Sequence, residues 1–264
     1  MKKFTVGEDV SLKNFTDNTY AQASFCFRTL LKAREIRVNG VKVDSDVMLK
    51  PGDEVQYFLT PAQEEKTAFS VVYEDENICV VDKESGVNTE AVFSALGFFG
   101  VHRLDRNTEG LLLLAKTEAA QEALIDAFRG RSVEKTYHAL VVGKMSKKHA
   151  VEEAYLQKDE RSALVKISAR PVGERIVTEY EVLEEREEVS LLKVTLHTGK
   201  THQIRAHMAF LGHPVVGDEK YGNTAFNKKL HLTRQRLLAK QLTLTLKGEL
   251  AYLNGKCFES KKTL

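Results

Sequence analysis

The sequence has few cysteines and no long apolar segment. Its 264 residues include only Cys26, Cys79 and Cys257, which lie far apart and form no CxxC pair. The composition therefore supports neither a disulfide framework nor a zinc ribbon, and a reducing compartment fits it best. No apolar run approaches the roughly 18 residues that a membrane helix needs, and the first residues turn acidic where a signal peptide would be apolar. We expect a cytoplasmic protein without a membrane partner.

The motifs of several enzyme classes are also missing. There is no GxSxG elbow, so a Ser-His-Asp hydrolase lacks support. Glycine-rich Walker and dinucleotide patterns are absent, so no nucleotide cofactor is expected. Four histidines lie close together, but His202 and His207 are five residues apart and would point about 140° apart on a helix. A helical zinc pair is spaced by four residues with a glutamate between them, so a metal site is not favoured.

A strong net charge is missing as well, yet the charges are unevenly distributed. The formal net charge is only +2. Residues 24–43 hold one acidic residue among several basic ones, and residues 220–240 hold no acidic residue. Such clusters can face a polyanion while the total charge stays near zero. Either cluster alone is equally consistent with a solvated surface of uneven charge.

Residues 61–68 divide the chain into two parts. They are polar, carry a proline and lack apolar periodicity, which is typical of a linker. Residues 1–60 contain a helical pattern at residues 21–33 and two alternating runs joined by Asn39-Gly40, the strongest short hairpin signal. Residues 69–264 are rich in strand patterns without regular βαβ spacing or an internal repeat. We therefore expect an α+β fold in which helices pack on a mixed, largely antiparallel sheet.

Three elements of the second part can be placed directly. The four leucines of residues 111–114 predict a buried strand. Thr117 is expected to cap a helix that Gly130 ends. A second helix is expected over residues 203–211, stopped by Gly212.

The densest polar stretch, residues 102–110, directly precedes the four leucines. In it Asp105 lies between Arg103 and Arg106, and nearby positive charge keeps a carboxylate ionised. Such a carboxylate suits a nucleophile or a general base, although a structural ion pair that pins the loop is an alternative. In a second polar cluster, residues 199–222, we expect Arg205 to project from its helix toward Asp105, with histidines orienting the neighbouring turn.

Four segments resemble the motifs of one enzyme family. Residues 102–110 resemble the HRLDxxTSG signature of the RluA-type pseudouridine synthases, and residues 134–143 resemble their K-x-Y-x-A-x-V-x-G strand. Residues 199–207 are similar to their G-R-T-H-Q-I-R-V-H motif, and residues 213–222 to their H-P-I-x-G-D-x-x-Y-G motif. Glu109 departs from the family serine, and Lys200 replaces an arginine. Residues 1–60 are similar to the S-four-type RNA-binding module, named for a ribosomal protein, that often precedes this catalytic domain.

The resemblance implies that the chain isomerises uridine to pseudouridine in RNA, without a cofactor or a metal. It implies a mixed antiparallel sheet with a central cleft over residues 69–264. Asp105 would be the catalytic residue, Arg205 its ion-pair partner and Tyr137 the tyrosine of the pocket, while Arg103 would replace the flipped uridine in the RNA helix. Further residues expected to bind substrate RNA are Arg106, His102, Lys200 and His202 near the site and Arg28, Lys32, Arg34 and Arg37 in the first part.

Ribosomal RNA is the expected target, with transfer RNA as the second candidate, and we expect a monomer. Two other functions are weighed against this one. A non-catalytic RNA clamp would have no need to keep Asp105, Tyr137 and Arg205 together. A hydrolase that uses Asp105 would release free uracil.

Overall fold

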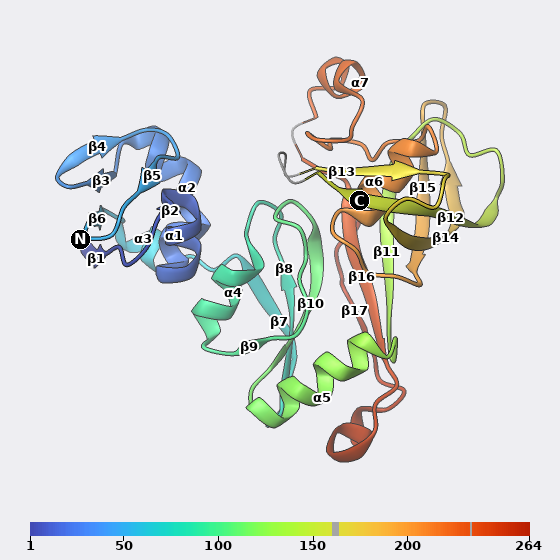
Figure 1. The fold of residues 1–264 in the computed structure, drawn as a ribbon, viewed down its shortest axis with the longest axis horizontal. Coiled ribbons are helices and arrows are strands. Elements are labelled where there is room, and N and C mark those ends of the chain that lie inside the picture. The colour runs from blue at the N-terminus through green and yellow to red at the C-terminus, as the bar shows by residue number, and fades with distance from the viewer. Residues whose placement is uncertain (160–163, 233) are drawn as a thin grey trace.

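The chain begins with a small unit in which two helices pack on a four-stranded antiparallel sheet (Figure 1). The structure, a computed structural model, describes residues 1–159, 164–232 and 234–264. The sheet has the strand order β1-β6-β3-β4, and β2 pairs with β5 beside it. The elements are β1 (Lys2–Thr5), β2 (Val10–Ser11), α1 (Leu12–Thr19), α2 (Ala21–Ala33), β3 (Ile36–Val38), β4 (Val41–Val43), β5 (Met48–Leu49) and β6 (Glu54–Tyr57).

The two elements expected in this unit are both present. Helix α2 covers the expected residues. Strands β3 and β4 form the hairpin, and Asn39 (φ 51°) and Gly40 (φ 81°) both have the positive φ that a two-residue type I′ turn requires.

The expected linker, residues 61–68, contains one short helix. Helix α3 (Pro61–Glu64) begins in a capping box, in which Thr60 and Gln63 each bond the other's backbone amide. Pro61 stands at the first helical position, where it leaves no intrahelical bond unmade. The Tyr20 hydroxyl donates to the Glu64 carboxylate and ties α3 to the unit.

An eleven-stranded sheet forms the frame of the second part. Its main strand order is β13-β12-β14-β15-β11-β16-β10-β8-β7, with β9 on β10 and β17 on β16. Among the described strand pairs only β10 and β16 run parallel, so the expected α+β fold with a mixed, largely antiparallel sheet is confirmed. The strands are β7 (Phe69–Glu74), β8 (Ile78–Lys83), β9 (Phe99–Gly100), β10 (Glu109–Ala115), β11 (Val133–Val142), β12 (His149–Lys158), β13 (Val165–Ser168), β14 (Glu174–Glu185), β15 (Val189–Leu196), β16 (Leu237–Leu244) and β17 (Cys257–Glu259).

Five helical segments accompany this sheet. They are α4 (Thr89–Leu96), α5 (Glu118–Arg129), α6 (Gln203–Phe210), α7 (Thr224–Lys229) and a 3-10 helix (Gly248–Leu253). As expected, the Thr117 side chain caps α5, which ends at Gly130, and α6 ends just before Gly212. Within the described residues no helix is long and apolar enough to span a membrane.

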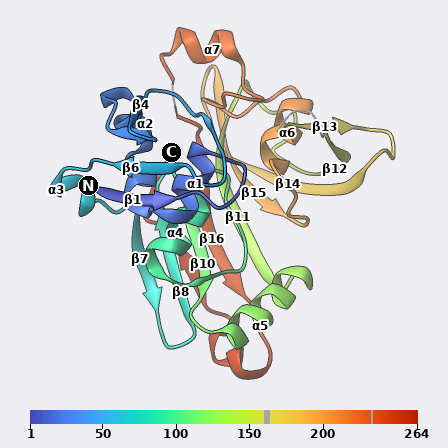
Figure 2. The same ribbon diagram turned by 60° about the vertical axis from the view of Figure 1, so that its left-hand side comes forward.

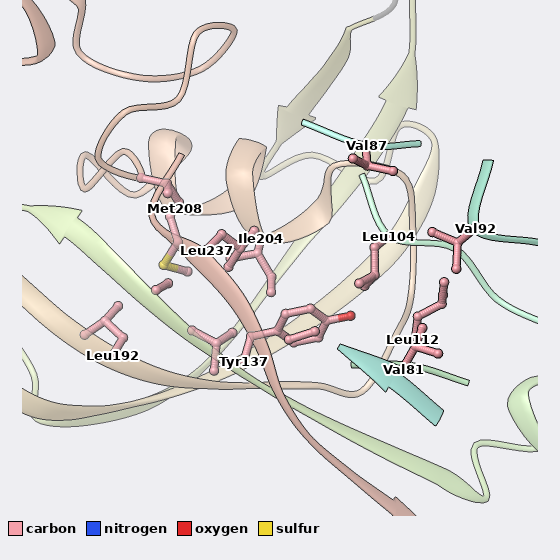
Figure 3. Close-up of a cluster of buried hydrophobic side chains, with 14 of the residues drawn as sticks. Val81, Val87, Val92, Leu104, Leu112, Tyr137, Leu192, Ile204, Met208 and Leu237 are labelled. Carbon is pink, nitrogen blue, oxygen red and sulfur yellow. The ribbon is translucent and has the colours of Figure 1, made fainter. Parts of the chain in front are cut away.

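Residues 78–81 of β8 and 111–115 of β10 are buried on both faces of the sheet, which explains why each of these runs is entirely apolar. Alternate side chains enter two different hydrophobic clusters. Leu112 and Leu114 belong to a cluster that includes residues of α4, and part of it is drawn in Figure 3. Leu111 and Leu113 belong to a cluster that includes residues of α5 and of the C-terminal segment.

The parallel pairing of β10 with β16 depends on Gly110. Its φ is 110°, and a Cβ at this position would lie 2.3 Å from the carbonyl oxygen of Ala239. Only glycine allows the two backbones to approach this closely. Strand β16 also pairs with β11, and Ala239 is the partner of both Gly110 and Tyr137, so the start of β10 and the middle of β11 lie at the same level of the sheet.

Candidate active site

A cleft of about 1650 Å³ contains most of the polar residues singled out in the sequence. Its walls include residues 100–108, which precede β10, residues 133–135 and 137 of β11, and residues 195–205, which lead from β15 into α6. Arg28 from the N-terminal unit also lines it. The polar loop before β10 and the polar cluster of α6 therefore meet in one place.

Asp105 and Arg205 form the ion pair that the sequence predicts. Arg205 Nη1 donates to Asp105 Oδ2 over 2.7 Å. The Arg205 side chain is only 6% exposed, whereas that of Asp105 is 24% exposed. The carboxylate thus faces the cleft while its cationic partner lies behind it.

The two flanking arginines do not supply this charge, which corrects the reason given for an ionised Asp105. Arg103 points outward, with its side chain 75% exposed and Nη2 lying 3.0 Å from a carboxylate oxygen of Glu90. Arg106 Nε donates to the carbonyl of Gly86, and its own carbonyl accepts from the Gly86 amide. Neighbours in a turn project in different directions, so the partner of Asp105 comes from α6 instead.

Asp218 fixes Arg205 from the other side. Arg205 Nε donates to Asp218 Oδ2 over 2.6 Å and Nη2 to Oδ1 over 3.1 Å. Burial alone would raise the pKa of Asp218, but the hydrogen bonds and charge of Arg205 hold it below its usual range. Burial likewise opposes the Arg205 cation, yet Asp218 and Asp105 together raise the pKa of Arg205. The guanidinium is therefore a permanent charge with a fixed orientation.

Sequence reasoning did not single out Asp218 as a site residue. The available signal was its place in the motif at residues 213–222. In that turn Oδ1 of Asp218 also accepts the amides of Lys220 and Tyr221. Gly217, one residue earlier, has a φ of 74°, and a Cβ there would lie 1.9 Å from the Arg234 carbonyl oxygen.

His202 and Tyr221 form a further layer around Asp105. His202 Nε2 lies 3.9 Å from Asp105 Oδ2, and Nδ1 shares a hydrogen bond of 2.9 Å with the Tyr221 hydroxyl. That hydroxyl also accepts the Val165 amide. Burial lowers the pKa of His202, so the ring is neutral near pH 7. A histidine does orient this turn, as the sequence predicts.

Tyr137 enters the cleft from β11. Its ring belongs to the first hydrophobic cluster, and Figure 3 shows Ile204 beside it and the hydroxyl directed to the side where Leu104 and Leu112 lie. Burial and then the charge of Asp105 raise the pKa of Tyr137. The phenol therefore keeps its proton beside the carboxylate.

His102 has a structural contact that argues against its expected role in RNA binding. Its Nε2 accepts the Leu113 amide over 2.9 Å, and its ring stacks on Phe128 with centroids 4.6 Å apart. Burial, and to a smaller extent Lys135, lower its pKa to about 3. The ring ties the polar loop to β10 and α5.

The other expected RNA-binding residues are dispersed. Lys200 lies in the cleft and forms an ion pair with Glu174. Of the four basic residues in the first part, only Arg28 lines the cleft. Arg34 pairs with Asp44 over 2.8 Å, Arg37 packs over the Phe58 ring, and Lys32 is exposed.

Across the described ranges no three His, Cys, Asp or Glu side chains are grouped so that they could hold an ion. Glu109 stands in place of the family serine, and its Oε2 lies 4.0 Å from Nη2 of Arg234.

The comparisons with known proteins agree with one another. The family model described as RNA pseudouridylate synthase matches residues 77–210. Ribosomal large subunit pseudouridine synthase C of Vibrio parahaemolyticus is 33% identical over 77% of this chain and 73% of its own. Ribosomal large subunit pseudouridine synthase D of Vibrio cholerae is 34% identical over 70% of this chain and 66% of its own. The solved structure of human RNA pseudouridylate synthase domain containing 1 is similar with a TM-score of 0.63 and 27% identity, over 74% of this chain and 83% of its own.

Proposed function

This chain belongs to the RNA pseudouridylate synthase family and is an isomerase that acts on RNA; we propose that it converts uridines of ribosomal RNA to pseudouridine, with Asp105 as its catalytic residue. The observation that carries the proposal is the linked set Asp105–Arg205–Asp218 at the wall of a large cleft. This arrangement presents the partly exposed carboxylate of Asp105 to a substrate, while the guanidinium of Arg205 that balances its charge stays buried.

The reaction requires that the target base leave its stack. Isomerisation breaks the bond from the ribose to a base nitrogen and remakes it to a base carbon, so the base must rotate while it is held. Enzymes that act on a base extrude it at a cost of a few kcal/mol. Arg103 is suited to fill the vacated space, because its guanidinium is exposed at the cleft and can stack on neighbouring bases once it leaves Glu90.

Asp105 then acts on the sugar. As a carboxylate it either attacks the ribose or removes a sugar proton, and both steps need the ionised form. Arg205 aims the carboxylate, since the guanidinium itself cannot turn while Asp218 holds two of its nitrogens.

Tyr137 is placed to hold the detached base. Its ring offers a stacking surface beside Asp105, and its hydroxyl stays protonated. The proton that leaves the base carbon at the end of the reaction would pass through this region.

Ribosomal RNA is proposed as substrate because the two Vibrio relatives carry that name. We assign residues 1–60 to an S-four-type RNA-binding unit and residues 69–264 to the catalytic domain. We propose that the chain acts as a monomer. The three cysteines are free, which suits the reducing cytoplasm.

The test is pseudouridine mapping of total RNA from cells with and without this gene, complemented by the wild type or by Asp105→Asn. We expect one or more sites in large-subunit ribosomal RNA to disappear with the gene and to return only with the wild type. Sites lost only from transfer RNA would correct the substrate. An unchanged map would favour a non-catalytic RNA clamp, and free uracil released by the purified protein would indicate a hydrolase.

A further inference from the structure

The N-terminal unit packs directly on the catalytic part. Helices α1 and α2 contact α4, and Figure 2 shows α1 lying over α4. Phe25 and Ala21 of α2 belong to the same hydrophobic cluster as Val87 and Val92 of the catalytic part. The unit is thus docked through a shared apolar core.

Asp17 of α1 fixes the docked position. This side chain is buried and accepts hydrogen bonds from Lys13 of its own helix, from Ser24 of α2 and from Asn88 of the catalytic part. Asn88 ends the segment of residues 84–88, which is bonded to the loop that carries the catalytic residue. Ser85 donates to the Asn107 carbonyl, and Gly86 exchanges hydrogen bonds with Arg106.

The docking places Arg28 in the cleft. Arg28 follows Ser24 by one helical turn, so it lies on the same face of α2. Its side chain is exposed, and no ion pair to a carboxylate is found for it among the described residues. Burial lowers the pKa of Arg106, and the charge of Arg28 lowers it further. Arg28 and Arg106 both line the cleft, where an anionic group of the substrate can pair with the exposed Arg28 guanidinium.

We infer that the docked unit is a wall of the active-site cleft and that Arg28 binds a backbone phosphate of a nucleotide beside the target uridine. This inference rests on the proposed function and extends it, because it assigns residues 1–60 a part in positioning the substrate at the reacting site. A guanidinium suits a phosphate because it forms two parallel hydrogen bonds with it.

The first experiment compares full-length variants on an unmodified transcript of large-subunit ribosomal RNA. Arg28→Ala should lower kcat/KM for pseudouridine formation about tenfold and reduce the salt slope of binding by about one. Arg28→Lys, which keeps the charge, should recover part of the loss. Lys50→Ala is the matched control: it removes an exposed charge of the same unit that does not line the cleft, and it should stay within about twofold of wild type.

The second experiment tests the docking. Asn88→Asp sets a carboxylate against the buried Asp17, and no cap of α4 is lost, because the Asn88 side chain makes no cap hydrogen bond at the start of that helix. It should undock the unit and reduce kcat/KM as Arg28→Ala does. In the double variant Arg28→Ala should cost nothing further, because an undocked Arg28 no longer reaches the cleft.

Two results would overturn the inference. One is an Arg28→Ala enzyme within about twofold of wild type with an unchanged salt slope. The other is full additivity of the two changes. A wild-type enzyme that forms no pseudouridine in the transcript would instead refute the proposed function.

Discussion

Arg205 gives two of its nitrogens to Asp218 and keeps the third for Asp105. The guanidinium of Arg205 therefore lies between the fully buried carboxylate of Asp218 and the carboxylate of Asp105, which faces the cleft. The fork of the guanidinium fixes both the distance and the direction of the catalytic group. The orientation of Asp105 therefore depends on Asp218, a buried residue that acts through Arg205.

Asp218→Asn should reduce kcat on the order of 100-fold while KM changes little, because a loosened Arg205 misplaces Asp105. Single-turnover kinetics at saturating enzyme measure the effect. Breaking a buried pair also costs stability, so thermal unfolding must show that the variant is folded at the assay temperature. A folded variant with kcat within about threefold of wild type would contradict the positioning role.

Asp105→Asn should abolish isomerisation, by about 10⁴-fold or more, with RNA binding retained. The change removes the ionised group but keeps the shape of the side chain. Pseudouridine yield and filter binding on the same transcript separate the two effects. Turnover within about tenfold of wild type would remove Asp105 from its catalytic role.

Tyr137→Phe should separate stacking from proton handling. The ring remains in the hydrophobic cluster, so KM should stay nearly constant while kcat falls by about 10- to 100-fold. Equal kcat in the variant and the wild type would restrict Tyr137 to packing.

His102 should make the protein sensitive to mild acid. Burial, and to a smaller extent the charge of Lys135, lower the pKa of His102 from its usual 6.5 to about 3 in the folded protein. Unfolding therefore takes up a proton between these values, and the stability present above pH 6.5 is lost as the pH falls. Down to about pH 5 this one residue should cost up to about 2 kcal/mol.

The matched variant is His102→Gln, which can still accept the Leu113 amide but does not titrate. Urea unfolding at neutral pH and at about pH 5 should show a smaller loss in the variant than in the wild type. Equal losses would show that the ring is protonated in the folded protein.

Gly110→Ala should lower the free energy of unfolding by about 2 to 4 kcal/mol, because the methyl group meets the Ala239 backbone and φ is positive. Gly7→Ala is the control, since nothing lies within 4 Å of its Cβ position and its φ lies outside the left-handed region. Urea unfolding of both variants measures the difference. Equal stabilities would mean that β16 can shift without cost.

The sequence predicted the strands and helices whose apolar residues follow a regular period. Strand β10 and helix α5 are such elements, and Thr117 marks the start of α5. Helix α1 could not be found in this way. Its buried side includes the polar residues Lys13, Thr16 and Asp17. Lys13 and Asn88 donate to Asp17, and the Thr16 hydroxyl donates to the Leu12 carbonyl. The helix is therefore buried without the apolar stripe by which a sequence reveals a helix.

The same limit applied to the site. The pairing of Asp105 with Arg205 was predictable because both stand in recognisable polar motifs. The positions of Arg103 and His102 were not, because a sequence does not reveal which side of a loop each side chain occupies. The docking of Arg28 depends on contacts between two separately folded surfaces, which no local pattern encodes.

The central position of β16 has a consequence for the order of synthesis. Asp105 precedes β10 and Tyr137 lies on β11, yet these two strands are joined only through β16, whose residues 237–244 are made about a hundred residues later. A nascent chain therefore carries the carboxylate and the phenol on two half-sheets that nothing yet holds together. Only once β16 has left the ribosome can the two half-sheets close, so the site cannot assemble before residues 237–244 are made.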